Sequence, residues 1–207
     1  MRSDGAPFER ARSNGRPRTR EGGQSLVEFA LVIPLFLVVF VGLIEFALVL
    51  NAVMSINYAS REASLIGAEA GNNANADCMI LEAVDTAVGA PASRTEITRV
   101  RIYQANRVGT PIAGRVNTYN RGGETSCDLP DGTVVRVPYT RVGVAGYPAT
   151  SRCNVLAGCG TTTTVDQIGV EVTYVYEWRT PLHTLLNLSG TGYILTKSNA
   201  MRMEPVL

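Results

Sequence analysis

Residues 22–44 read GGQSLVEFALVIPLFLVVFVGLI, and this stretch decides how the chain is built. It joins an arginine-rich head to a long apolar run, and it carries one carboxylate, Glu28, where that run begins. A carboxylate at the mouth of a membrane span is costly and therefore indicates a function. An ordinary secretory signal has its small-residue cleavage site after the apolar run, whereas Gly22 and Gly23 come before it. This order predicts a segment that the mature protein keeps.

The apolar run from Phe29 to Leu50 predicts a transmembrane helix. It has 22 residues and a single charge, Glu45, and a membrane-spanning helix needs roughly 20 residues. A core helix of a soluble protein is the competing interpretation, but no other segment of the chain is able to surround such a helix on every side. We expect Glu45 either to pair within a bundle of helices or to be solvated near the outer membrane face.

The basic charge of the chain is concentrated before this run. The rest of the chain, from residue 24 onward, has 13 basic and 15 acidic residues, so the sequence does not predict nucleic-acid binding. A cluster of arginines beside a hydrophobic span is held in the cytoplasm by the positive-inside rule. The sequence therefore predicts a single-pass membrane protein with a cytoplasmic N-terminus and an extracytoplasmic C-terminal domain; a basic disordered tail is the alternative. The clustered residues are Arg2, Arg10, Arg12, Arg16, Arg18 and Arg20.

All four cysteines follow the span, on the side expected to be oxidising. An even number of cysteines in a small exported domain indicates disulfides. Two bridges allow three pairings, of which we favour the local pair Cys153–Cys159 together with Cys78–Cys127. An all-cysteine metal site is the weaker alternative, because the chain has no Cys-x-x-Cys spacing. We expect no metal and no cofactor.

The helix is predicted to continue beyond the membrane as far as Ala70. Small and apolar residues recur there at alternating three- and four-residue spacing, which forms a seam for close packing. Ser25 and Glu28 match a capping box at the helix start, and Pro34 removes one backbone hydrogen bond inside the helix. The chain thus divides into a leader (1–23), a long helix (24–70) and a domain (71–207). The seam consists of Val49, Ala52, Ile56, Ala59, Ala63, Ile66 and Ala70.

The domain is expected to be α+β, with an antiparallel sheet of three to four strands. Its elements are predicted from alternation and turn residues. Asp77 is expected to cap a short helix that reaches Val88, and Gly122-Gly123 and Asp131-Gly132 are turn signals. The expected strands are Ile97–Ala105, Thr133–Tyr139, Ile168–Trp178 and Tyr193–Arg202, with a short helix over Pro181–Leu188 and a long loop over 140–164.

No residue pattern indicates catalysis. His183 is the only histidine, and a lone histidine on a short helix is more often a surface residue than a catalyst. The chain lacks both a phosphate-binding glycine loop and the serine nucleophile pattern. We therefore expect no enzyme.

The pattern around Gly23 resembles a known processing signal. Gly23 is followed by four residues, then Glu28 and Phe29 and an apolar run, as in a type IV prepilin site. With Pro34 and Glu45 in register, residues 22–70 are similar to TadE-like proteins (the TadE/TadG family) of the Tad, or Flp-type, pilus systems. The last ten residues resemble that family's ending more loosely.

This resemblance implies a pilin-like fold and a role as a structural subunit. An inner-membrane prepilin peptidase would cut between Gly23 and Gln24. The apolar helix would remain and pack against other pilin subunits, with Glu28, Phe29, Pro34 and Glu45 as assembly residues. The implied function is that of a minor pilin or pseudopilin, which is exposed on a filament after assembly.

Two other functions remain open from the sequence. The first is an uncleaved, membrane-anchored adhesin or pilus-assembly scaffold, and the second is a major filament subunit. A buried carboxylate in a filament core needs a partner. We hypothesise that Glu28 pairs there with the amine of Gln24 that cleavage frees on a neighbouring subunit.

Overall fold

The computed structural model describes residues 23–128, 132–155, 159, 164–187, 190 and 192–204. The leader up to residue 22, Asp131 of the expected turn, Leu188 at the end of the expected short helix and residues 205–207 lie outside this part. The predicted division into leader, helix and domain stays a prediction. By its contacts the chain forms two compact units, Met1–Phe40 and Val41–Leu207.

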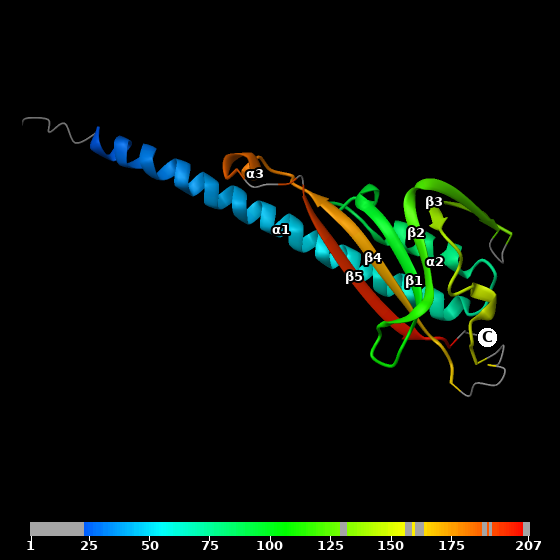
Figure 1. The fold of residues 1–207 in the computed structure, drawn as a ribbon. Coiled ribbons are helices and arrows are strands. Elements are labelled where there is room, and N and C mark those ends of the chain that lie inside the picture. The colour runs from blue at the N-terminus through cyan, green and yellow to red at the C-terminus, as the bar shows by residue number, and fades with distance from the viewer. Residues whose placement is uncertain are drawn as a thin grey trace, which may run out of the picture. The chain divides into compact units, whose positions relative to one another are not determined.

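The long helix α1 runs from Gln24 to Ala70 without interruption, as predicted (Figure 1). It begins one residue before Ser25, so Ser25 lies in the first turn and is not the helix cap that the capping-box pattern predicted. The amide of Val27 donates to the carbonyl of Gly23 at 3.2 Å, which closes the first turn. This hydrogen bond places Gly23, and not Ser25, at the position that precedes the helix.

The α+β class with an antiparallel sheet is confirmed, and the sheet has five strands, one more than the sequence predicted (Figure 1). Their order is β3-β2-β1-β4-β5, and every neighbouring pair is antiparallel. The strands are β1 (Ile97–Ala105), β2 (Pro111–Asp128), β3 (Val134–Val142), β4 (Gln167–Glu177) and β5 (Gly192–Arg202). The shorter elements are α2 (Ala76–Ala87), η1 (Arg94–Glu96), η2 (Ala149–Ser151) and α3 (Leu182–Leu185).

The strand that the sequence missed is β2. Its glycines hid it, because Gly122-Gly123 is a turn signal in a sequence and here lies inside a strand. The register between β2 and β3 shifts between Arg121 and Thr125, so the glycines form a bulge. Gly122 has φ +120°, and a Cβ on Gly123 would collide with the Thr140 side chain. Both positions therefore require glycine.

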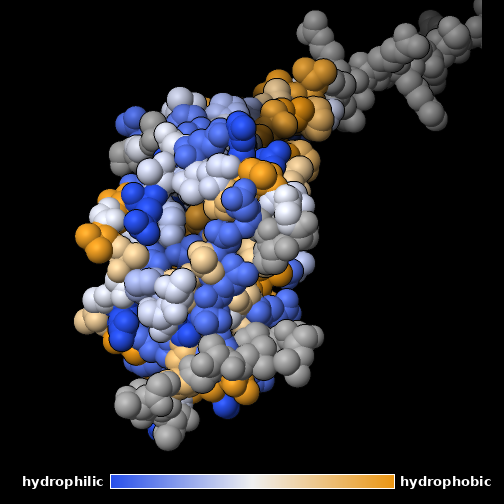
Figure 2. All heavy atoms as spheres, turned by 90° about the vertical axis from the view of Figure 1, so that its right-hand side faces the viewer, coloured by the Kyte–Doolittle hydropathy of each residue, from blue (hydrophilic) through white to orange (hydrophobic). Residues whose placement is uncertain are grey.

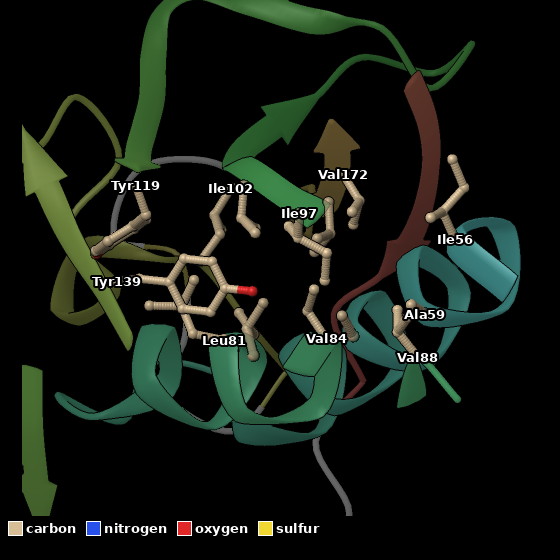
Figure 3. Packing of buried hydrophobic residues seen from close by; sticks show 14 of the residues in the cluster. Ile56, Ala59, Leu81, Val84, Val88, Ile97, Ile102, Tyr119, Tyr139 and Val172 are labelled. Atoms are coloured by element: carbon tan, nitrogen blue, oxygen red, sulfur yellow. The ribbon is translucent and has the colours of Figure 1, made fainter. Parts of the chain in front are cut away.

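The core lies between one face of the sheet and two helices, α2 and the second half of α1. Figure 3 shows side chains from the strands, such as Ile97 and Ile102, meeting Leu81 and Val84 of α2 and Ile56 of α1. The predicted seam is largely confirmed, and its centre is fully buried. The buried seam positions are Ala52, Ile56, Ala59 and Ala63.

Small residues let α1 approach the sheet closely. Ser60, which the sequence placed off the seam, is buried and donates a hydrogen bond of 2.8 Å to the carbonyl of Val170 in β4. A Cβ on Gly67 would lie 2.9 Å from the Ile168 side chain. The seam of alanines thus faces the chain's own sheet.

Asp77 does not cap α2 as predicted, because the helix begins at Ala76 and its N-cap is Asn75. The Asp77 carboxylate instead accepts hydrogen bonds from Asn117 at 2.8 Å and Tyr119 at 2.6 Å. It also forms an ion pair with Arg152, whose side chain is fully buried. An aspartate near a helix start is able either to cap the helix backbone or to bind groups from elsewhere in the fold. Here Asp77 binds groups from elsewhere.

The disulfides are Cys78–Cys127, which joins α2 to β2, and Cys153–Cys159, which closes a local loop. This is the pairing that the sequence favoured. The first bridge fixes one end of α2 on the sheet, and the second lies in the long loop between β3 and β4. Figure 2 shows a mostly hydrophilic surface at the end of the domain that carries β3 and α2, which suits contact with water.

We predict that Ile56→Ala lowers the free energy of unfolding by about 2–5 kcal/mol, because it opens a cavity where α1 meets the sheet. Urea unfolding of the full chain in detergent micelles, followed by near-ultraviolet circular dichroism, measures the change. Met54→Ala is the matched control, since Met54 lies on the same helix and is 64% exposed. Equal effects of the two substitutions would contradict the packing of α1 described above.

Candidate functional site

The residues expected to direct processing lie at the start of α1. Gly23 immediately precedes the helix, and a Cβ placed on it would meet no atom within 4 Å. Gln24 is the first helical residue, and its side-chain amide donates to the Glu28 carboxylate at 3.1 Å. The bond between Gly23 and Gln24 therefore sits at a helix boundary with open space beside it.

The described part of the first unit, residues 23–40, exposes many apolar side chains. Phe29 is 64% exposed, and the rings of Phe36 and Phe40 stack on each other with centroids 6.1 Å apart. The helix is long and apolar enough to cross a membrane. No residue in its most apolar 18-residue segment is buried. So much exposed apolar surface requires a nonpolar solvent or a partner.

Pro34 lies inside α1, at a position where the chain remains helical. Proline has no N–H, so the carbonyl of Ala30 receives no helical hydrogen bond from it. Such a position is tolerated in membrane helices when neighbours or local adjustments satisfy the carbonyl. Gly23, Gln24, Glu28, Phe29 and Pro34 all belong to the first unit.

Glu45 belongs to the second unit and has a different environment. Only 3% of its surface is exposed, and its sequence neighbours in α1 are apolar. Its Oε1 accepts hydrogen bonds from the Tyr176 hydroxyl at 2.5 Å and from the Arg179 amide at 3.2 Å. Its Oε2 accepts from the Thr180 amide at 2.9 Å. We call these four residues the Glu45 junction.

The fold explains how these donors reach the helix. Tyr176 is the penultimate residue of β4, so its side chain points to the buried face of the sheet where α1 lies. After β4 ends at Glu177, the backbone turns, and two successive amides at Arg179 and Thr180 face the carboxylate. Both amides lie beyond the end of the strand ladder. The carboxylate thus satisfies backbone donors at the end of a strand that would otherwise be orphaned.

The surroundings of the junction are also polar and paired. Burial raises the pKa of Tyr176, and its hydrogen bond to Glu45 raises that pKa further, so the phenol stays protonated and remains a donor. The Arg179 side chain forms an ion pair with Glu96, which precedes β1. Three accepted hydrogen bonds suit a carboxylate, which accepts and does not donate when ionised.

The sequence singled out Glu45 but not its partners. The expectation of a solvated carboxylate is wrong, because the side chain is buried, and the partners that the structure shows come from the chain's own domain. The assembly role of Glu45 stays a prediction. The sequence does indicate that the Glu45 carboxylate needs hydrogen-bond donors from outside the helix. The residues one helical turn away, Val41 and Val49, have no side-chain donor. It does not signal which distant strand end supplies them.

Other titratable residues of the described ranges also form paired clusters, one of Asp77 with Tyr119 and Arg152 and one of Asp85 with Arg121 and Tyr139. Among them, no group of three or more His, Cys, Asp or Glu side chains is placed to hold a metal ion. His183 stacks on Trp178 with ring centroids 6.0 Å apart, and its Nδ1 lies 3.1 Å from the Thr180 carbonyl. These contacts hold α3 beside the Glu45 junction.

We predict that Glu45→Ala lowers the stability of the domain by about 1–3 kcal/mol, because three donors lose their acceptor. Tyr176→Phe removes one of these bonds and should cost about 1 kcal/mol. In the Glu45→Ala background the same Tyr176→Phe change should cost much less, and urea unfolding of all four proteins in detergent measures this difference. Glu69→Ala, an exposed carboxylate of the same helix, is the control. A Tyr176→Phe cost that does not depend on Glu45 would contradict the coupling.

Comparison with known proteins identifies the N-terminal helix. A search of curated proteins found no match to the chain, and a search of solved structures found none either. Residues 23–65 match the TadE-like protein family, which confirms the resemblance found in the sequence. The match begins at Gly23, before the first residue of α1, and ends inside the seam that packs on the sheet. Residues 23–65 are therefore similar to TadE-like proteins, a family associated with Tad pilus systems.

Proposed function

We propose that this protein is a pilin-like structural subunit, a minor pilin or pseudopilin, that is inserted in the inner membrane and assembles through the N-terminal half of α1. The observation that carries this proposal is the exposed apolar surface of α1, which is directly preceded by Gly23 and Glu28 in the pattern of a prepilin processing site. The TadE-like match over this same segment supports it. The family is a pilus-associated structural family, so we propose no catalytic activity.

The proposal assigns each half of α1 a separate task. The first half offers apolar side chains to lipid before assembly and to other subunits afterwards. The second half is already covered by the sheet and is unavailable to other helices along its buried side. Assembly contacts are therefore assigned mainly to the first half, because the second half offers only its exposed side.

The length of the chain favours a minor subunit. Major Flp-type pilins are usually much shorter than 207 residues. In this proposal the basic leader stays in the cytoplasm, in keeping with the positive-inside rule, and the domain with its two disulfides lies outside the cytoplasm. An inner-membrane prepilin peptidase would release the leader and leave Gln24 as the first residue.

We predict that the mature native protein begins at Gln24, which N-terminal sequencing or mass spectrometry of protein from its own host would measure. Gly23→Val should abolish this cleavage without unfolding the domain, because a side chain at this position meets no neighbour. Gly89→Val is the matched control, since a Cβ there also meets no atom within 4 Å. A native protein that keeps its leader would favour the alternative function, that of an uncleaved anchored adhesin or scaffold.

We further predict that Glu28→Ala reduces incorporation into the pilus or pseudopilus at least about tenfold, because the charged amine of Gln24 on the neighbouring subunit loses its partner. Quantitative immunoblotting of sheared surface fractions, normalised to membrane-bound protein, measures the incorporation. Glu69→Ala should assemble normally, because this carboxylate lies on the exposed side of the other half of α1. Wild-type assembly of Glu28→Ala would refute the pairing.

A further inference from the structure

The part of α1 between Phe29 and its contact with α3 is shorter than the hydrocarbon core of a bilayer. Leu182 of α3 contacts α1 at Gly42, where a Cβ would lie 3.9 Å from the leucine side chain. The part of the span before this contact, from Phe29 to Val41, has 13 residues, which at 1.5 Å per residue amounts to about 20 Å. The hydrocarbon core of a bilayer is about 30 Å thick. For a span that starts at Phe29, the remaining thickness would coincide with the part of the domain that surrounds Gly42 and Glu45.

That part of the domain is the connection from β4 to β5. The chain contains no Asp, Glu, Lys or Arg between Arg179 and Lys197. We call the described residues of this stretch, together with Trp178, the β4–β5 hairpin tip: 178–187, 190 and 192–196. A charge-free run with a basic residue at each end is compatible with entry into a membrane interface, because long basic side chains reach back to the headgroups.

Four large, mainly apolar side chains of the hairpin tip are exposed. Leu185 of α3 is 66% exposed, and Ile194 of β5 is 74% exposed. Leu186 and Tyr193 are each 51% exposed. The outward surface of α1 at the same level is apolar too, since Leu43 is 62% exposed. The hairpin tip and this part of the helix therefore both offer apolar side chains to their surroundings.

Aromatic residues mark one boundary of this surface. Trp178 lies against Tyr193 in an edge-to-face arrangement, with ring centroids 5.1 Å apart, and it stacks on His183. Tryptophan and tyrosine concentrate at the headgroup level of membranes, where their rings are apolar and their N–H and O–H groups reach water. The Arg179 side chain beside them is already paired with Glu96, so its charge adds little cost.

We propose that the β4–β5 hairpin tip is a second membrane contact, seated in the lipid headgroup and upper acyl layer of the leaflet that faces the domain. The inference rests on the proposed insertion of α1 in the membrane. The proposal also explains the Glu45 junction. At this depth in a membrane, a carboxylate and two backbone amides are tolerated only when they form hydrogen bonds with one another. The hairpin tip thereby fixes the depth of the helix.

Trp178 allows a direct test, because it is the only tryptophan of the chain. The full-length protein is reconstituted into phosphatidylcholine vesicles whose acyl chains carry bromine either near the headgroup or near the chain end. We expect Trp178 fluorescence to be quenched at least about twofold more strongly by the shallow bromines than by the deep ones, as befits an interfacial indole. Iodide in the aqueous phase should quench it weakly. Strong iodide quenching without bromine quenching would overturn the inference.

The double substitution Leu185→Asp with Ile194→Asp should lift the hairpin tip from the lipid, so that bromine quenching falls and iodide quenching rises. Both residues are largely exposed, so the domain itself should remain folded. Val144→Asp is the matched control, because Val144 is 93% exposed and lies outside the hairpin tip. Unchanged quenching in the double variant would contradict the lipid contact.

Two further measurements distinguish a lipid contact from a contact between copies of the chain and from a failure of the helix to insert. Diluting the protein tenfold in lipid should leave bromine quenching unchanged, whereas a shift on dilution would assign the hairpin tip to a contact between copies and overturn the inference. Flotation of the vesicles on a density gradient tests the proposed insertion itself. Protein that fails to float would overturn both proposals, and protein that floats with an unquenched Trp178 would overturn only this one.

Discussion

A carboxylate buried in an apolar helix must receive hydrogen bonds from elsewhere, and the junction at Glu45 meets this requirement. One phenol and two backbone amides from the end of β4 converge on its two oxygens. If the Glu45 carboxylate were buried without these donors, the carboxylate oxygens would lack hydrogen bonds, and so would the phenol and the two amides. This contact and the hydrogen bond from Ser60 to Val170 add directional constraints on the position of the sheet along α1, which apolar packing alone supplies only weakly.

The same helix has to suit two environments. In its first half apolar side chains cover every side and remain exposed, which suits lipid or other apolar helices. In its second half, small residues such as Ala59, Ser60 and Gly67 allow the sheet to approach closely. The change occurs near Gly42 and Glu45, where α3 and the end of β4 contact the helix. Side-chain size and polarity along one continuous helix thus separate the surface left open from the surface that the domain covers.

Residues with a strong local pattern could be predicted from the sequence, and residues whose role depends on distant partners could not. The long helix, strand β1 and the cysteine pairing follow from apolar periodicity, alternation and spacing. Strand β2 was missed because Gly122 and Gly123 signal a turn, while their bulge is set by pairing with β3. Asp77 matched a helix cap and instead binds Asn117, Tyr119 and Arg152, which lie 40 or more residues away. Glu45 was recognisable as a misfit, but its donors lie 131 to 135 residues further along the chain.

Backbone hydrogen exchange tests most directly whether Glu45 holds the end of β4 on the helix. The amides of Arg179 and Thr180 lie beyond the strand, so their protection depends on the Glu45 carboxylate. In the full chain, reconstituted in lipid nanodiscs, we expect these two amides to exchange as slowly as those within β4, and to become fast in Glu45→Ala while β4 stays protected. Exchange of Arg179 and Thr180 at the rate of an open loop in the wild-type protein would contradict the account.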